Sequence, residues 1–288
     1  ERYVLAAGAQ SFTLGASGQN VTLDSTGSSG SVAIGTGTLT SVTGTLDDGT
    51  GNDTIALTLA TTGVDISSAN TTDVDSIALA SGVSATMTIA QHALITSAVG
   101  NNTVTLSNAG TVSGNAAVEA YVLAAGAQSF TLGASGQNVT LDSTGSSGSV
   151  AISTGTLTSV TGTLDDGTGN DTIALTLATT GVDISSANTT DVDSIALASG
   201  VSATMTIAQH ALITSAAGTN TVTLSNAGTV SGNAAVEGYV LAAAGNSAFT
   251  LGATGQNITT GSAGSDTIVV GTLAATGTFN TVSGDTVS

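Results

Sequence analysis

Apolar and polar residues alternate in short runs along the chain. In residues 31–34 and 103–106, every second position is aliphatic and the positions between carry Ser, Thr or Ala. Gly, Ser, Asn or Asp separates one run from the next. Alternation with a period of two buries one face of a strand and leaves the other in solvent. Short strands at this close spacing predict an all-β fold.

The predicted strands of the first third of the chain are residues 3–5, 11–14, 20–23, 31–34, 39–42, 53–57, 63–66, 75–79, 85–89 and 103–106. Residues 87–95 depart from this pattern, because they lack glycine and their apolar positions fit neither a strand nor a helix period. For this segment we predict a strand that runs into one short helical turn at the edge of a coil.

The chain contains an internal repeat. Residues 3–120 and 121–238 align without gaps and differ at four positions, and a partial, divergent third copy begins at Tyr239. We therefore divide the chain into copy 1 (1–120), copy 2 (121–238) and copy 3 (239–288). Near-identical tandem copies are typical of folds in which each unit contacts only its neighbours.

A parallel β-helix or β-roll solenoid agrees best with these features, and tandem β-sandwiches are the alternative. Sandwich cores usually draw volume from aromatic residues, whereas aromatic residues form only 2% of this chain. The connections are short and rich in Gly, Ser and Asn, as the corners of a coil would be. At roughly 20–30 residues per coil and about 4.8 Å per stacked strand, one copy would form about four to six coils.

The net charge restricts the classes of partner and function that we expect. The chain has one basic residue, Arg2, against nineteen acidic ones, which gives a net charge of −18. Nucleic acids and anionic lipids are therefore excluded as expected partners, because phosphate binding needs Lys and Arg. No apolar run approaches the roughly 20 residues of a membrane helix, so we expect no membrane insertion. We also expect no enzyme, because the acidic clusters lack the basic and aromatic side chains that usually accompany polysaccharide-cleaving carboxylates.

One acidic turn recurs in each copy. Residues 47–57 read DDGTGNDTIAL, residues 165–175 repeat them unchanged, and residues 261–269 contain a related GSAGSDTIV. The glycines permit a sharp turn with positive φ. The aspartates supply several oxygens at one place, which suits a hard cation such as Ca²⁺. The alternative is an acidic corner that is merely solvated.

The turn Gly49-Thr50-Gly51-Asn52-Asp53-Thr54-Ile55 resembles the glycine- and aspartate-rich nonapeptide of RTX-type calcium-binding β-rolls, with Asp48 and Asp166 in place of its first glycine. Only one good nonapeptide occurs in each copy, so a neighbouring coil would have to complete the ligand shell, through Asp73, Asp75, Asp24 or a carbonyl. The candidate metal ligands are Asp47, Asp48, Asp53, Asp73, Asp75, Asp165, Asp166, Asp171, Asp191, Asp193 and Asp266.

The repeat as a whole is similar to the RTX-like regions of very large bacterial surface proteins, namely adhesins, S-layer proteins and extracellular filaments. Residues 3–6, 73–79, 85–91 and 103–106 carry this similarity. The resemblance implies secretion to the cell surface or extracellular matrix, calcium-dependent folding and a structural or adhesive role. Separately, the first and last coils would present unpaired strand edges and the chain has no Lys to guard them, so we expect self-association into a filament or lattice. The alternatives are an adhesive module that recognises a glycan or a partner surface and, less favoured, an ice-binding face. His92 and His210 occupy one position in two copies, and we interpret them as structural.

Overall fold

The computed structural model describes residues 1–6, 8–24, 30–124, 126–141, 148–273 and 276–288. Its strands are parallel and stack as a β-solenoid of about 14 turns, with about 3% of the residues helical. The predicted all-β solenoid is therefore confirmed. Parallel stacking also excludes the sandwich alternative, whose sheets would be antiparallel.

Two compact units make up the chain. Unit 1 comprises Glu1–Gln128, Asn138–Gly148 and Gly167–Gly169, and unit 2 comprises Ser129–Gln137, Ser149–Asp166 and Asn170–Ser288. Strand β14 (Ala127–Thr131) spans the division. Each unit is described by itself below.

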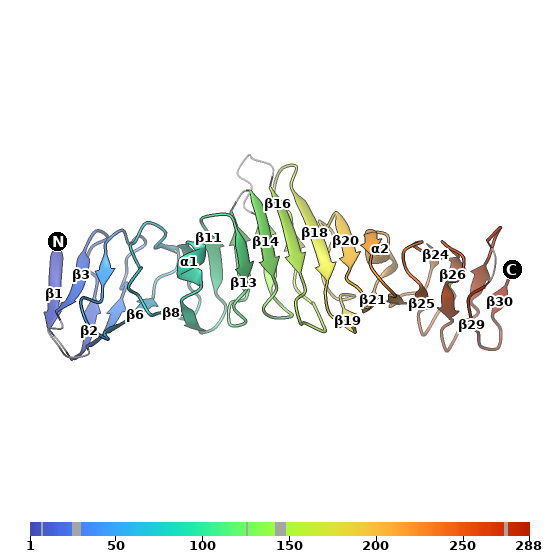
Figure 1. The fold of residues 1–288 in the computed structure, drawn as a ribbon, viewed down its shortest axis with the longest axis horizontal. Helices are drawn as coiled ribbons and strands as arrows, with labels where there is room; N and C mark the ends of the chain where they lie inside the picture. Colours follow the sequence, from blue (N-terminus) through green and yellow to red (C-terminus); the bar gives the residue numbers. More distant parts are fainter. Residues whose placement is uncertain (7, 25–29, 125, 142–147, 274–275) are drawn as a thin grey trace. The chain divides into compact units, whose positions relative to one another are not determined.

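Successive strands of unit 1 alternate between sheets, so each turn of the coil contributes two strands. The odd strands form the orders β1-β3-β5 and β7-β9-β11-β13-β15, and the even strands form β2-β4-β6-β8-β10 (Figure 1). These strands are β1 (Arg2–Ala6), β2 (Ala9–Thr13), β3 (Asn20–Asp24), β4 (Ser31–Gly35), β5 (Leu46–Asp47), β6 (Thr54–Leu59), β7 (Val64–Asp65), β8 (Ser76–Leu79), β9 (Ser84–Met87), β10 (Ile95–Ala98), β11 (Thr103–Leu106), β13 (Ala120–Leu123) and β15 (Asn138–Leu141). The short β12 (Thr111–Ser113) follows β11.

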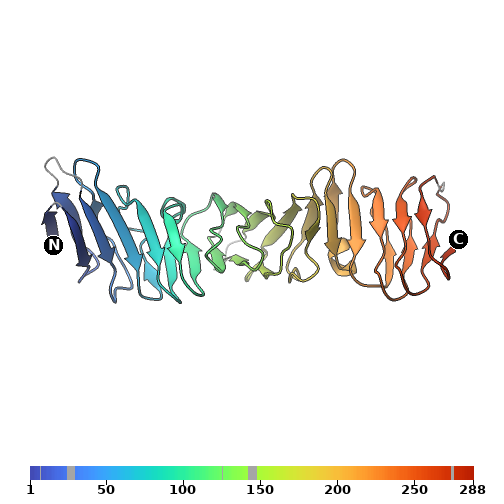
Figure 2. The ribbon, with the colours of Figure 1, turned by 90° about the horizontal axis from the view of Figure 1, so that it is seen from below.

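Unit 2 repeats this arrangement. Its sheets have the orders β16-β18-β20-β22, β19-β21-β23-β25-β27-β29 and β24-β26-β28-β30, and Figure 2 shows such strands side by side as rungs. The strands are β16 (Ser149–Ser153), β17 (Leu164–Asp165), β18 (Thr172–Leu177), β19 (Val182–Asp183), β20 (Ser194–Leu197), β21 (Ser202–Met205), β22 (Ile213–Ala216), β23 (Thr221–Leu224), β24 (Thr229–Ser231), β25 (Gly238–Val240), β26 (Ala248–Thr250), β27 (Asn257–Thr259), β28 (Thr267–Val269), β29 (Phe279–Asn280) and β30 (Thr286–Val287).

The coil continues across the boundaries between copies. Within unit 1, β13 opens copy 2 and pairs with β11 of copy 1, with Val104 opposite Tyr121. Within unit 2, β25 opens copy 3 and pairs with β23 of copy 2 in the same register, with Val222 opposite Tyr239. The repeat in sequence is therefore not a boundary between separately folded coils.

Aliphatic side chains stack in register inside the coil. Ile34 of β4 lies opposite Leu57 of β6, which lies opposite Ile77 of β8. All three are buried, at 0%, 1% and 0% exposure. Each rung buries one such face, and burial of a Leu or Ile side chain stabilises the fold by roughly 1.5–3 kcal/mol. The thin aliphatic core predicted from the alternation is confirmed.

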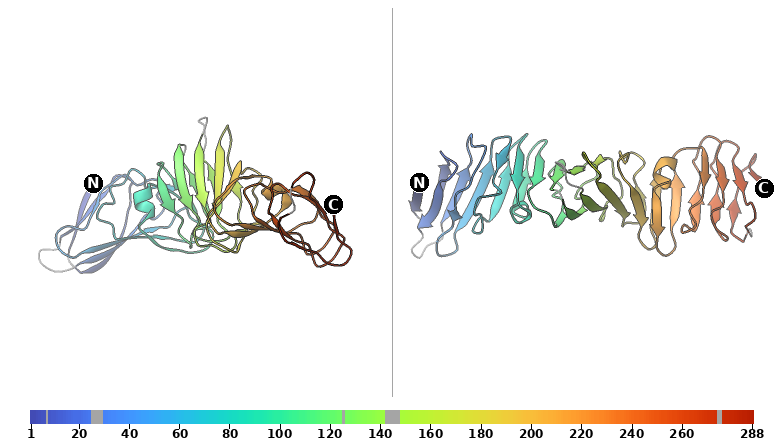
Figure 3. Two further views of the ribbon diagram at one scale, coloured as in Figure 1. Left: turned by 45° about the vertical axis from the view of Figure 1, so that its right-hand side comes forward. Right: turned by 90° about the horizontal axis from the view of Figure 1, so that it is seen from above.

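The helical turn predicted within residues 87–95 is also confirmed. Helix α1 (Ile89–His92) directly follows β9, and its counterpart in unit 2 is α2 (Ile207–His210) (Figure 3). The Thr88 side chain accepts from the Gln91 backbone, and the Gln91 side chain accepts from the Thr88 backbone at 2.8 Å. This reciprocal capping box starts a helix that would be too short to form alone.

One predicted strand was wrong. Residues 39–42 follow a turn at residues 37–38 and make a single isolated bridge, between Ser41 and Asp65, although Val42 is fully buried. The Leu39 backbone N–H bonds back to Thr36 O at 3.0 Å, which bends the chain where a strand would continue. The short β5, β10 and β12 were not predicted, because two- to four-residue pairings leave little alternation to detect.

Candidate metal centre

The acidic turn lies where two neighbouring strands begin. Strands β6 and β8 are parallel, with Ala56 opposite Ser76, so the segments that lead into them meet at one edge of the sheet. The segment before β6 carries Asp47 and Asp48, and the segment before β8 carries Asp73. The repeat thus brings together carboxylates that are far apart in sequence.

Three of the predicted ligands form a cluster. Carboxylate oxygens of Asp47, Asp48 and Asp73 lie within 4.8 Å of one another, and all three side chains are half-buried. Asp47 also accepts from the Gly49 backbone N–H at 2.8 Å, in a turn where Gly49 and Gly51 have φ of 81° and 142°. The predicted glycine-dependent turn is therefore confirmed, and its conformation strongly disfavours side chains other than glycine.

Copy 2 contains the same cluster within unit 2. Oxygens of Asp165, Asp166 and Asp191 also lie within 4.8 Å of one another. Because the two copies are identical over these turns, the second cluster follows from the first and is not an independent observation. It does show that any cation-binding property would recur once per copy.

The clustered charges affect one another. Partial burial raises the pKa of Asp48, and the nearby negative charges of Asp73, Asp75, Asp47 and Asp53 raise it further. The pKa of Asp166 is raised in the same way, first by burial and then by Asp191, Asp193, Asp165 and Asp171. Like charges held this close repel one another, and a divalent cation among them would relieve that repulsion.

The nonapeptide aspartate makes a hydrogen bond between turns, and its predicted role as a metal ligand stays a prediction. Asp53 is only 5% exposed, and its Oδ1 accepts from the backbone N–H of Gly30 in the preceding turn. Asp75 likewise accepts from the Ile55 backbone N–H at 2.8 Å. Asp53 and Asp75 thus connect adjacent turns through backbone hydrogen bonds, and neither belongs to the cluster of three.

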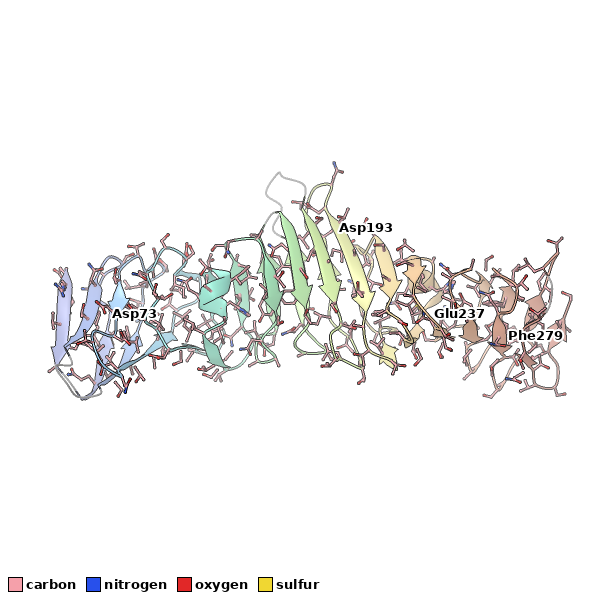
Figure 4. The ribbon with its side chains drawn as sticks, viewed as in Figure 1. Asp73, Asp193, Glu237 and Phe279 are labelled. Carbon is pink, nitrogen blue, oxygen red and sulfur yellow. The ribbon has the colours of Figure 1, made fainter. Side chains whose placement is uncertain are left out.

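The corresponding residues of unit 2 follow this division. Asp193, labelled in Figure 4 at the start of β20, accepts from the Ile173 backbone N–H at 2.8 Å. Asp171 is 5% exposed, as Asp53 is. In copy 3, Asp266 accepts from the backbones of Ser247 at 2.7 Å and Gly261 at 2.9 Å. The side chain of Asp24 lies outside the described residues.

Three carboxylates from two segments form a donor set suited to a hard divalent cation. Such ions take six to eight oxygens, so backbone carbonyls and water would have to supply the remainder. The residues that would hold the ion are Asp47, Asp48 and Asp73 in copy 1, and Asp165, Asp166 and Asp191 in copy 2.

Sequence reasoning missed a group of structural residues beside the site, the buried glutamines. Gln91 is 3% exposed, and its Nε2 donates to Ile66 O at 2.8 Å and Ala69 O at 3.2 Å. Gln209 makes the equivalent bonds in unit 2. The sequence signal was Thr88-x-x-Gln91 after a strand, which is a capping-box pattern.

A surface hollow also recurs. In copy 1 it has a volume of about 390 Å³, and its lining includes Ser67, Asn70, Thr72, Thr88 and Gln91. The equivalent hollow of copy 2 has a volume of about 420 Å³. Both linings combine hydroxyl and amide groups with a larger apolar surface, and neither contains an aromatic side chain from the described part of the chain.

Comparisons with protein-family models, with curated proteins and with solved structures found no match for this chain. Within the described residues, no helix has the length and apolar character needed to cross a bilayer.

Proposed function

We propose that this chain is a segment of an extracellular structural protein of the bacterial cell surface or matrix. It would be a repetitive β-solenoid that forms the shaft, filament or lattice of a surface assembly, without enzymatic activity. The observation that carries this proposal is the repetition of the same strands, core and turns in copies 1 and 2. Such repetition extends a solenoid without creating a new surface in each copy.

We further propose that Ca²⁺ stiffens the solenoid at the two acidic clusters. A chain with a net charge of −18 concentrates repulsion where carboxylates meet, as at Asp47, Asp48 and Asp73. A bound divalent ion offsets this repulsion, and its binding free energy adds to the stability of the folded state.

Self-association belongs to the same proposal. Charged residues, especially Lys, normally discourage pairing between strands of separate molecules, and this chain has no Lys and a single Arg. Pairing of that kind would join copies of this chain into a filament or lattice.

Two measurements test the proposal. Circular dichroism melting in a chelator should show a lower melting temperature than in millimolar Ca²⁺, and Mg²⁺ should give a smaller effect. Sedimentation and electron microscopy in Ca²⁺ should show fibres or sheets. Equal melting temperatures with and without Ca²⁺ would refute the calcium part, and a monomer at high concentration would refute the assembly part.

Glycan binding is the second candidate, and the hydroxyl and amide groups in the recurring hollow favour it. Its hydroxyl and amide groups, among them Asn70, Thr72 and Thr88, match the hydrogen-bonding groups of a sugar. The double variant Asn70→Ala/Asn188→Ala should abolish retention on a polysaccharide column if the hollow binds sugar. Retention by that variant equal to the parent's, or none by either protein, would exclude this candidate.

A further inference from the structure

The two histidines lie in a buried cluster that the acidic centre does not use. In unit 1 this histidine cluster consists of His92 at the end of α1, Tyr121 on β13 and Asn115 between them. His92 and Tyr121 are 6% and 1% exposed. In unit 2 the cluster consists of His210, Tyr239 and Asn233, and the histidine and tyrosine are 5% and 1% exposed.

Hydrogen bonds connect the three residues of the histidine cluster. The Asn115 backbone N–H donates to Tyr121 Oη at 2.7 Å, and Tyr121 Oη lies 2.9 Å from His92 Nε2. In either neutral tautomer, His92 Nε2 and the Tyr121 hydroxyl share one hydrogen bond. The corresponding distances in unit 2 are 2.7 Å and 3.0 Å.

The cluster holds successive turns together. The Asn115 side chain donates to Ile95 O at 2.9 Å, next to α1, while Tyr121 belongs to the following turn. The tyrosine ring also contacts the imidazole edge to face, with ring centres 5.5 Å apart. The bond between His92 and Tyr121 therefore attaches α1 to the strand that opens copy 2.

The ionisable groups around α1 have partners of their own. They are Tyr121, Glu119 just before it and Asp65 on β7. Asp75 also lies near, two residues before Ile77, whose backbone N–H donates to Leu94 O, and Asp193 has this position in unit 2. Glu119 accepts from the Asn102 backbone N–H at 2.7 Å, and Asp65 from the Ser67 backbone N–H at 2.8 Å. Among the described residues, no carboxylate forms an ion pair or hydrogen bond with His92. In unit 2 the equivalent groups are Tyr239, Glu237 and Asp183.

We propose that the histidine cluster is an acid-sensitive switch, present once in each full copy, in which protonation of His92 and His210 releases the short helix from the following tyrosine strand. Protonation makes both ring nitrogens donors and places a positive charge in a buried site where no carboxylate of the described residues bonds to it. Mild acidification thus loosens the solenoid at α1 and α2.

The direction of the pH effect follows from burial. Burial lowers the pKa of both histidines below the ordinary value of 6.5, whereas the unfolded chain titrates at that value. The unfolded state therefore binds protons first as the pH falls. The contribution of the two neutral histidines to the free energy of unfolding is fully present above about pH 6.5. It is lost as the pH falls from there through the lowered folded pKa.

The test measures thermal stability from about pH 8 to pH 5 in a chelator, so that metal binding does not contribute. The melting temperature of the parent protein should fall below about pH 6.5. The double variant His92→Gln/His210→Gln keeps hydrogen-bonding groups but cannot titrate at these positions, so its melting temperature should fall clearly less. Tyr3→Phe is the matched control, because Tyr3 occupies the same repeat position but bonds to Glu1 at 2.8 Å instead of a histidine.

The titration of the histidines can also be measured directly in the parent protein, which tests the proposal even if the double variant does not fold. Nuclear magnetic resonance titration of the parent protein should show both imidazoles titrating below about pH 6.5, together with amide shifts in α1, α2 and the tyrosine strands. Imidazoles that titrate at or above the ordinary value would overturn the proposal. So would a His92→Gln/His210→Gln variant whose pH dependence equals that of the parent.

Discussion

At the residue scale, aspartates of one acidic turn divide into two roles. Asp53 is buried and bonds to the Gly30 backbone, whereas Asp73 is half-buried and faces Asp47 and Asp48. The nonapeptide pattern predicts Asp53 as a metal ligand in the same way as the neighbouring aspartates. Only the stacking of turns distinguishes an aspartate that bonds to the backbone of the adjacent turn from one whose carboxylate lies in the cluster of three.

The variant Asp53→Ala should destabilise the protein by about 1–3 kcal/mol, because it leaves the buried Gly30 N–H without its acceptor. Asp53→Asn keeps an acceptor oxygen and should recover much of this loss. Asp73→Asn should instead leave stability in chelator nearly unchanged and reduce the gain from Ca²⁺. Chemical denaturation with and without Ca²⁺ measures both effects, and equal behaviour of Asp53→Ala and Asp73→Asn would contradict the division.

Repulsion within the clusters gives a second prediction. The pKa values of Asp48 and Asp166 are raised in the folded state, so their stabilising contribution exists at low pH and is lost as the pH rises through the raised folded pKa. At neutral pH both carboxylates therefore destabilise the cation-free protein. Asp48→Asn/Asp166→Asn should then raise stability in chelator by roughly 0.5 kcal/mol, after allowance for solvent screening.

The same double variant should gain less from Ca²⁺ than the parent, because each cluster loses a charged ligand. Melting temperatures at neutral pH in chelator and in Ca²⁺ provide the comparison. A variant that is less stable than the parent in chelator would show that these carboxylates support the fold without an ion.

At the element scale, the sequence predicted the fold class, the core positions and the helical turn within residues 87–95. These features were predictable because each strand buries alternate residues, and this alternation can be recognised within a short stretch of sequence. Pairing partners were not predictable, since contacts between turns join residues such as Ile55 and Asp75 that no local pattern relates. For the same reason the grouping of Asp73 with Asp47 and Asp48 required the structure.

Glycines mark where neighbouring turns approach most closely. A Cβ on Gly44 would overlap the backbone oxygen of Gln19, whereas the nearest atom to a Cβ on Gly35 is Thr13 Oγ1 at 3.9 Å. Gly44→Ala should therefore destabilise the coil by about 1–3 kcal/mol. Gly35→Ala is the matched control and should be nearly neutral, because copy 2 carries Ser153 at that position. Equal effects of the two substitutions would argue against this packing.

The capping glutamine gives a further prediction at this scale. Gln91→Ala removes one hydrogen bond from each of Ile66 O and Ala69 O and also one half of the capping box, although Ile66 O still accepts from the Ala69 backbone N–H at 2.8 Å. We expect a loss of about 2–3 kcal/mol, because two hydrogen bonds at a buried amide and the cap are lost together. Thr88→Ala should cost about 1 kcal/mol, the usual value for an N-cap. Urea denaturation measures both losses of unfolding free energy. If the glutamine bonds were unimportant, Gln91→Ala would cost less than Thr88→Ala.

At the scale of the whole molecule, repetition determines how the chain unfolds. Each turn of a solenoid contacts only its neighbours, so stability is close to a sum over turns and adjacent interfaces. A local weakness should therefore unfold its surroundings without unfolding distant turns. Copies 1 and 2 allow a controlled test, because the same side chain can be removed from either copy in an almost identical environment.

Leu57 and Leu175 are the matched positions for this test. Each is 1% exposed and lies opposite an isoleucine of the next strand, Ile77 or Ile195. Leu57→Ala should cost about 2–5 kcal/mol locally and speed amide exchange in β4, β6 and β8. Exchange in the equivalent strands of copy 2 should stay unchanged, and Leu175→Ala should give the reverse pattern. If either substitution accelerated exchange equally in both copies, the chain would unfold as one cooperative unit, and a switch that acts locally in each copy would lose its physical basis.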